Sequence, residues 1–363
     1  MKAELKKLIS RPQTWIILVL LCISVPVLML RHVPQDRALR RLFRQAIRTH
    51  STDYLQAAAA LQAELDAMDT SAMQPDSAEY QQYLVLTNLI GSKDTFAERD
   101  RLVREALTDF SAQMQATQDA YVRADLQKAY DAYNRAYPYR LCYVIPLSLS
   151  LQNTQDNMYC IVFAAAVLCL FCGVFASEHE SGMYQILFST KRGKRFLFRK
   201  KVTASLALLC VTALIYTAEL YLFVWIKYGI SASMFFSPLQ SLPEYAWCPF
   251  ALNIAEYALL HALCILLAGS FLFALTVLCS AVLKSSVQVL CVSAVCAVCS
   301  AVCSRKLGLL RLMRHGDYLQ QYETVNIQNV PVFSILAAAV FTVCACAFLI
   351  FTARMLWCRN GGD

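Results

Sequence analysis

The sequence EHESGMYQILFSTKRGKRFLFRKK, residues 178–201, lies between two long apolar stretches, and the arrangement of the whole chain can be inferred from it. It begins with acids and becomes strongly basic in its second half, where the basic residues are Lys191, Arg192, Lys194, Arg195, Arg199, Lys200 and Lys201. A short basic segment between two membrane spans is expected on the cytoplasmic side. This segment therefore predicts the orientation of every span.

Apolar residues recur in the middle of this segment at helical spacing. Met183, Ile186 and Leu187 fall on one face of a helix, so residues 182–190 are expected to form a short amphipathic helix. An amphipathic helix in the cytoplasm, between two spans, is a surface on which a soluble partner can push.

Residues 178–201 resemble the first cytoplasmic loop of type-two ABC exporter permeases. That loop typically reads acid, acid, Gly-Thr, two leucines, a small or proline-containing turn, an Arg, and a Lys that enters the next span. The matching positions here are Glu178, Glu180, Gly182, Ile186, Leu187, Gly193, Arg195 and Lys200 or Lys201. Two departures, Met183 for Thr and Ser-Thr-Lys-Arg-Gly for Ser-x-Pro, indicate a divergent bacterial branch.

The resemblance implies a permease subunit that moves an unidentified substrate outward. It would form a homodimer, or pair with a second permease, and bind an ABC ATPase on a separate chain. ATP and Mg²⁺ would be bound by that ATPase. The residues that the resemblance assigns to ATPase coupling are Glu178, Glu180, Gly182, Ile186, Leu187 and Gly193.

The composition independently indicates a polytopic membrane protein. Of the 363 residues, 58% are hydrophobic and 16% are charged, whereas soluble domains are about 25% charged. The formal net charge is +8. Because most of the basic excess flanks the membrane, positive-inside bias and anionic lipid explain it, and no nucleic-acid partner is expected.

The apolar stretches predict an all-α membrane protein with six transmembrane helices, at residues 15–30, 159–176, 202–226, 256–283, 287–303 and 332–357. The segments around them are a basic elbow at 1–14, a coupling loop at 177–201, outer loops at 227–255 and 304–331, and a tail at 358–363. Both termini are then cytoplasmic and the protein lies in the plasma membrane. Residues 307–313 are a candidate interfacial helix. The alternative for the N-terminus, a signal peptide, lacks a cleavage site after Leu30.

Residues 31–158, between the first two spans, form an insert of a different composition. They are rich in Ala, Gln, Asp, Arg and Tyr, and Gly91 is their single glycine. Helical patterns cover residues 37–68, 78–90 and 95–137, which predicts an extracellular helical hairpin or three-helix bundle. A structural stalk and a domain that captures or gates substrate are both open interpretations.

Motifs for catalysis or nucleotide binding are missing from the sequence. Gly193-Lys194 lacks the upstream glycine and the following hydroxyl of a phosphate-binding loop. The predicted spans contain no Ser/His/Asp order, no His-Glu-x-x-His and no paired-aspartate motif. The chain is therefore expected to be no enzyme, to have no catalytic residues and to bind no cofactor itself.

Most of the sixteen cysteines lie inside apolar stretches, where cysteine behaves as a small hydrophobe. Cys296, Cys299 and Cys303 fall on one face of the predicted fifth span. Zinc would require four ligands with polar partners behind them. Packing of small residues between helices is the better interpretation, and no metal site is expected.

Five acidic or imidazole side chains remain as candidates. Glu178 and Glu180 would begin the amphipathic helix, where the helix dipole favours acids. Glu219, Glu256 and His261 lie within or at the edge of spans, where charge costs at least about 2.5 kcal/mol at the membrane centre. They are candidates for a substrate path; interfacial snorkelling or a structural hydrogen bond is the alternative.

Two functions from other classes compete with the permease interpretation. A membrane receptor or sensor would bind a ligand through the insert, but it would need a sizeable cytoplasmic output domain, and the longest predicted inner segment is residues 177–201. A scaffold without transport is the other alternative. The substrate is open among peptides, drugs and amphiphiles, and the insert favours a peptide or amphiphile.

Overall fold

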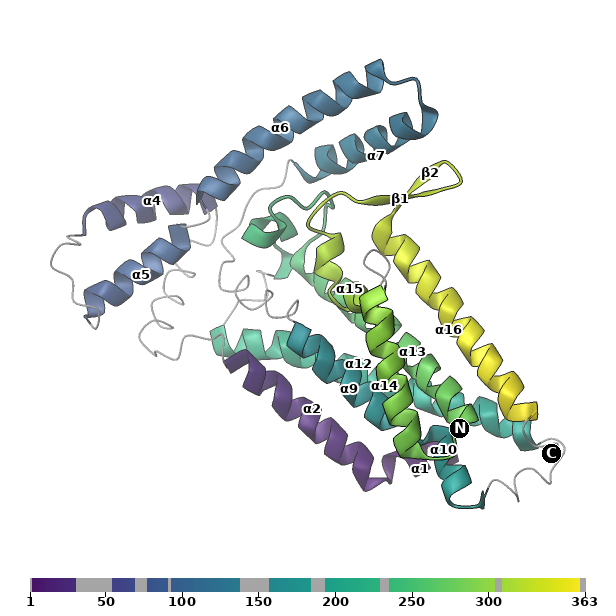
Figure 1. Cartoon of the computed structure of the whole chain (residues 1–363). Helices are drawn as coiled ribbons and strands as arrows, with labels where there is room; N and C mark the ends of the chain where they lie inside the picture. Colours follow the sequence, from purple (N-terminus) through teal and green to yellow (C-terminus); the bar gives the residue numbers. More distant parts are fainter. Residues whose placement is uncertain are drawn as a thin grey trace.

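The computed structural model describes residues 2–30, 54–68, 77–90, 93–137, 157–183, 193–228, 235–303 and 309–359. Within these ranges the chain is mostly helical. A bundle of apolar helices forms one part of the molecule, and an arm of amphipathic helices extends from one end of it (Figure 1). The small β-hairpin between them lies beside the arm (Figure 1).

The bundle consists of α2 (Pro12–Leu30), α9 (Asn157–Phe171), α10 (Gly173–Glu180), α12 (Gly193–Tyr228), α13 (Ile254–Val282), α14 (Ser286–Cys303) and α16 (Ser334–Arg359). Four stretches are long and apolar enough to cross a membrane: 157–180, 194–223, 254–282 and 334–359. The chain is therefore a helical membrane protein, as its composition predicts. Helices α2 and α14 are apolar but shorter, so the number of six spans remains a prediction.

Helix α13 forms the centre of the bundle and packs against α9, α12, α14 and α16. The close approach is clearest at Gly269, where a Cβ atom would lie 3.2 Å from the Phe163 ring and 3.1 Å from a Leu209 methyl group. One turn further along, Phe273 meets Phe171 edge to face at 5.0 Å. A side chain larger than hydrogen at position 269 would push α9 and α12 away from α13.

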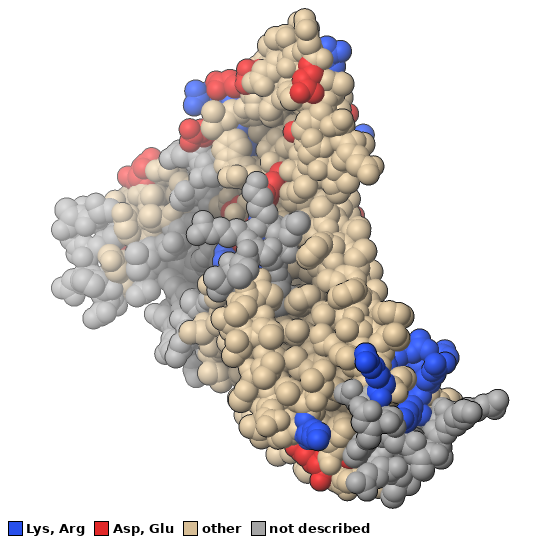
Figure 2. Space-filling view, turned by 45° about the vertical axis from the view of Figure 1, so that its right-hand side comes forward, with Lys and Arg blue, Asp and Glu red and all other residues tan. Residues whose placement is uncertain are grey.

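The two ends of the bundle differ, and we name them by what lies there. At the terminal end lie α1 (Lys2–Ile9) and the last turn of α16 (Figure 1). At the insert end lie the arm, the short helices η3 (Leu239–Ser241), η4 (Pro243–Tyr245), α15 (Leu309–Met313) and η5 (His315–Tyr318), and the β-hairpin. Charged side chains gather at both ends and leave a largely uncharged band between them (Figure 2).

The arm contains α4 (Tyr54–Asp66), α5 (Ala78–Ile90), α6 (Lys93–Ala116) and α7 (Ala120–Ala136). The predicted helix at 78–90 is confirmed, whereas the single helix predicted at 95–137 is wrong. Asp119 divides it, because its carboxylate accepts the backbone N–H groups of Tyr121 and Val122 and so starts a new helix. The predicted first helix, 37–68, is described only from residue 54 onwards.

A β-hairpin near the C-terminus departs from the all-α prediction. Strands β1 (Thr324–Ile327) and β2 (Val330–Phe333) pair antiparallel. The turn between them has positive φ at both central residues, 52° at Gln328 and 65° at Asn329, which suits the twist of a two-residue hairpin. The last apolar helix therefore begins at Ser334 and not at the predicted 332.

The helix predicted at 307–313 is present in its described part as α15, and it packs against the bundle. Leu312 and Met313 are buried, with exposed fractions of 1% and 2%, and α15 packs against α13. The interfacial position of this helix stays a prediction. With Leu312 and Met313 of α15 buried, residues 309–319 pack into the insert end of the bundle.

Candidate functional site

At the terminal end, one buried carboxylate joins three helices. Glu178 in the last turn of α10 accepts hydrogen bonds from Lys201 of α12 at 2.6 Å and from Lys7 of α1 at 2.8 Å, both at Oε1. The Glu178 and Lys201 side chains are only 3% and 5% exposed. The Lys201 ammonium also donates to the Val174 carbonyl at 2.7 Å. We call Glu178, Lys201 and Lys7 the terminal-end cluster.

The three members of this cluster are unequal in burial. Lys7 is 46% exposed, so water screens its attraction to Glu178. Lys201 is almost fully buried and has no comparable access to water. A buried charge requires a paired partner and further hydrogen bonds to be tolerated, and Lys201 has both in Glu178 and Val174.

Two further contacts attach neighbouring segments to α10. The Glu180 carboxylate accepts the backbone N–H of Ser286 at 2.7 Å and its hydroxyl at 3.1 Å. An acid at this place caps the N-terminus of α14. Arg11, which precedes α2, donates to the Ser177 hydroxyl at 3.0 Å. Helix α10 is thereby held to α1, α12, α14 and the start of α2.

These contacts correct one sequence-based expectation. Glu178 and Glu180 do not begin a helix but lie at the end of α10. The dipole that Glu180 complements belongs to α14, whose first residue is Ser286. The reason is that α10 continues the preceding apolar helix as far as Glu180, and Gly182, whose φ is +69°, follows directly after its C-cap.

The remaining coupling residues are only partly described. Gly182 lies in the turn after α10, and Gly193 is the first residue of α12. Ile186 and Leu187, together with most of the predicted amphipathic helix, lie outside the described residues. The described contacts therefore show how the two ends of this segment are held, at Glu178 and at Lys201. The amphipathic helix between them remains a prediction.

The three side chains proposed for a substrate path have separate surroundings. Glu256 is exposed and forms a capping box with Asn253 at the start of α13. Glu219 of α12 is half-buried, and the Cys22 thiol of α2 lies beside it. His261 is buried and contacts Tyr221 of α12 at 3.1 Å. Among the described residues, no hydrogen bond or ion pair joins these three side chains to one another.

His261 belongs instead to a buried group of aromatic side chains at the insert end. Its ring stacks on His315 of η5, with the centroids 4.6 Å apart and the planes 16° apart. Tyr257 lies 4.7 Å from the His315 ring, and its hydroxyl is 2.7 Å from that of Tyr245. We call Tyr221, Tyr245, Tyr257, His261 and His315 the insert-end cluster.

The sequence-based candidates include His261 but not His315. His315 stands in a segment that was expected to lie outside the membrane core, next to Arg311 and Arg314. The sequence feature that points to His315 is the apolar run of residues 307–313 just before it, because such a run can bury one face of its segment against other helices. Only the packing of α15 against α13 brings His315 onto His261.

The arm contacts the bundle through α7. Asp125 accepts hydrogen bonds from the hydroxyls of Tyr322 and Thr324, both at 2.8 Å. Lys128 donates to the Pro331 carbonyl at 2.6 Å and lies 4.2 Å from the centre of the Phe333 ring. Burial, followed by the bond to Asp125, raises the pKa of Tyr322. These contacts attach the arm to the hairpin that leads into α16.

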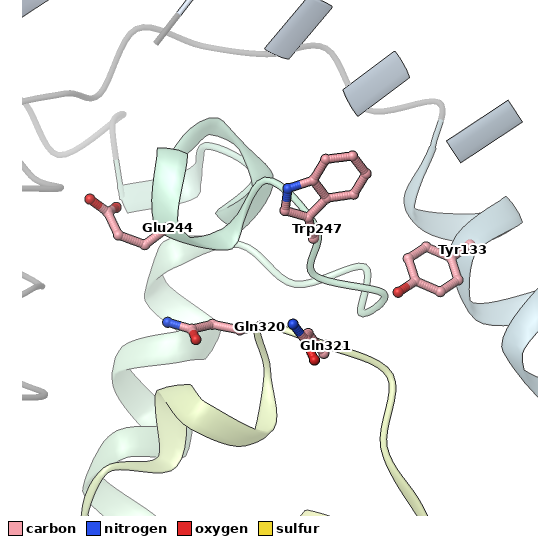
Figure 3. Close-up of a pocket in the computed structure, with 5 residues that line it drawn as sticks. All are labelled: Tyr133, Glu244, Trp247, Gln320 and Gln321. Carbon is pink, nitrogen blue, oxygen red and sulfur yellow. The ribbon is translucent and has the colours of Figure 1, made fainter. Parts of the chain in front are cut away.

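A cavity of about 380 Å³ lies beside this junction (Figure 3). Its lining consists of Tyr133, Glu244, Trp247, Gln320 and Gln321. The Tyr133 hydroxyl points toward the cavity from α7, and the two glutamines lie below Trp247 (Figure 3). Aromatic rings next to amide groups suit an organic ligand that offers both apolar surface and hydrogen-bonding groups.

The described residues contain no group of three His, Cys, Asp or Glu side chains that could hold a metal ion. Cys296 and Cys299 are free and exposed on α14, and the side chain of Cys303 lies outside the described part. Exposed thiols on an apolar helix suit contact with lipid or with another helix.

The chain matches no protein-family model, no curated protein and no solved structure.

Proposed function

We propose that this chain is the membrane-spanning permease subunit of an ATP-driven ABC exporter. The proposal rests on the resemblance of residues 178–201 and on the terminal-end cluster. That cluster attaches both ends of the predicted coupling segment to the bundle, through Glu178 before it and Lys201 after it. A partner that pushes on such a segment moves α10 and α12 together.

In this proposal the terminal end faces the cytoplasm and the insert end faces outward. The basic residues that begin α12 then lie at the inner surface, as positive-inside bias requires. Helices α2 and α14 complete six spans with both termini inside. Two copies, or this chain and a second permease, would bind two ATPase subunits that hold ATP and Mg²⁺.

The mechanism follows from the attachments of α10. Closure of the ATPase dimer would displace the segment after Gly182, and the buried pair of Glu178 with Lys201 would transmit the displacement to α12. The bond from Glu180 to Ser286 would transmit it to α14. Helix α10 would thus couple one cytoplasmic displacement to several spans, which opens the path outward.

The test is a detergent pull-down of the tagged chain from its native host. An ATP-binding protein should accompany the wild type and be lost with Gly182→Arg and with Leu187→Asp. Gln113→Asp, on an exposed position of α6, is the matched control and should retain the ATPase. Absence of any ATPase from the wild-type sample under gentle conditions would contradict the proposal.

A receptor or sensor is the second candidate, and the cavity between the arm and the bundle favours it. A ligand there would contact Tyr133 of α7 and Trp247 after η4 simultaneously. Binding would therefore change how the arm is held. The receptor function predicts ligand-induced protection of both segments in hydrogen exchange without any associated ATPase.

A further inference from the structure

Residues 309–319 form a plug in the insert end of the bundle. This segment contains α15 and η5, and the buried side chains in its described part are Leu312, Met313, His315, Tyr318 and Leu319. It packs against α13, α14 and α16. Its own cations are paired: Arg311 binds Glu323, and Arg314 binds Asp317 at 3.3 Å.

The centre of the plug is an imidazole pair with unusual hydrogen bonding. His261 and His315 are 1% and 0% exposed. His261 uses Nδ1 toward Tyr221, but its Nε2 and both ring nitrogens of His315 have no hydrogen-bond partner. Buried polar atoms are normally partnered, because leaving one unpaired retains its full desolvation cost. Three such atoms in two stacked rings therefore call for a functional explanation.

The surroundings of the pair disfavour a charge. Two titratable side chains contact the pair: Tyr221 of α12, 3.1 Å from His261 Nδ1, and Tyr257 of α13, whose ring lies 4.7 Å from that of His315. Neither tyrosine is ionised at neutral pH. The charged groups of the segment itself, Arg311, Arg314 and Asp317, pair with Glu323 or with each other. Among the described residues, no carboxylate acts on either ring. Burial, and next the neighbouring His261, lower the pKa of His315 well below its usual range. The Met313 carbonyl acts in the opposite direction and raises this pKa, but it forms no regular hydrogen bond with the ring.

We propose that His261 and His315 form a proton-binding site that holds residues 309–319 in the bundle when both rings are neutral and releases them in acid. A proton on either ring would be a charge in an apolar site. A proton on each would place two like charges in stacked rings 4.6 Å apart. Release of residues 309–319 from the bundle removes the desolvation cost of the charge and the repulsion between the two charges, because the rings then reach water. This device does not depend on whether the chain is a permease.

The sign and size of the effect follow from linkage. In the released state each imidazole titrates near its ordinary pKa of about 6.5, whereas in the plugged state both rings remain neutral. The plugged state is therefore fully favoured above about pH 6.5 and loses favour as pH falls. Each histidine shifts the ratio of released to plugged protein by up to about tenfold per pH unit, so the pair shifts it by up to about 100-fold.

The test is hydrogen exchange of residues 309–319 in the full chain in lipid nanodiscs, from pH 8 to pH 5, with exchange times corrected for intrinsic rates. Wild type should be protected at pH 8 and lose protection below about pH 6.5. The α6 peptide, residues 93–116, serves as an internal control and should not change with pH.

His315→Phe is the decisive variant, because it keeps an aromatic ring in the stack and loses no hydrogen bond. It should retain protection of the segment to a lower pH than wild type. His261→Phe provides a second variant, and His179→Gln, at the terminal end, is the control that should behave as wild type. Protection of the wild-type segment at pH 5 would overturn the proposal, and so would an unchanged midpoint in His315→Phe.

Discussion

The two ends of the bundle bury ionisable side chains in opposite ways. At the terminal end Glu178 and Lys201 are charged, lie 2.6 Å apart and are completed by further hydrogen bonds. At the insert end His261 and His315 are stacked and leave three ring nitrogens unpartnered. A buried ion pair is difficult to break, because removing either partner leaves the other as an uncompensated buried charge. Unpartnered neutral imidazoles can accept protons, so this end is suited to change.

The largest effect is expected from breaking the buried ion pair. Glu178→Leu leaves Lys201 buried without its counter-charge, and the loss in free energy of unfolding should be about 3–5 kcal/mol. Denaturant titration in detergent measures it. The double variant Glu178→Leu with Lys201→Met should recover much of the loss, since no charge then remains buried. A double variant as unstable as Glu178→Leu would show that shape, and not charge, dominates this site.

Removing an ionisable ring at the other end should have the opposite sign. His315→Phe eliminates two unpartnered nitrogens without breaking a hydrogen bond, so at pH 8 the free energy of unfolding should rise by about 1–3 kcal/mol. The same titration measures it. His315→Ala is the comparison, because it removes the nitrogens and the stacking together and should destabilise. Destabilisation by Phe would mean that the imidazole nitrogens have partners after all.

The junction of the arm with the hairpin should respond on a smaller scale. Asp125→Ala removes the acceptor of two hydroxyl groups, Tyr322 and Thr324, and should cost about 1–2 kcal/mol locally. Hydrogen exchange of α7 and of residues 322–333 should increase while α13 remains protected. Asp131→Ala on the same helix is the matched control, because among the described residues its carboxylate accepts a hydrogen bond from Gln127 alone. Equal hydrogen exchange of these segments in the two variants would show that Asp125 does not hold the arm to the hairpin.

The smallest effect concerns the exposed member of the terminal-end cluster. Lys7→Ala removes an ion pair whose cation is 46% exposed, and such pairs contribute about 0–1 kcal/mol. Lys201→Ala should cost several times more in the same titration, because Glu178 would lose its buried counter-charge. Similar losses in the two variants would indicate that α1 contributes more to the cluster than its exposure implies.

The predictions that succeeded depend on short-range features of the chain. The helix at 78–90 and the apolar helices follow from runs of side chains within one element, because hydropathy and helical spacing are local properties. The break at Asp119 is also local, yet it was missed. One capping side chain interrupts a helical pattern of apolar residues that otherwise continues on both sides of it.

The candidate site was predictable only as a set of residues, not as a set of contacts. Glu178 is among the residues that the sequence singles out, but its partners Lys7 and Lys201 lie 171 and 23 positions away in sequence. Glu219, Glu256 and His261 were grouped because all three are ionisable near spans. Their contacts separate them, because each faces a different neighbour: Cys22, Asn253 and Tyr221.

The amino-acid order alone establishes a membrane protein of apolar helices with a polar insert and a basic segment at 191–201, since these are sums over neighbouring residues. Tertiary packing establishes which polar groups are paired. Glu178 is a partnered charge because α1, α10 and α12 converge on it, and His315 is a buried base because α15 enters the bundle. Pairing and desolvation depend on distances between elements remote in sequence, and no local pattern encodes those distances.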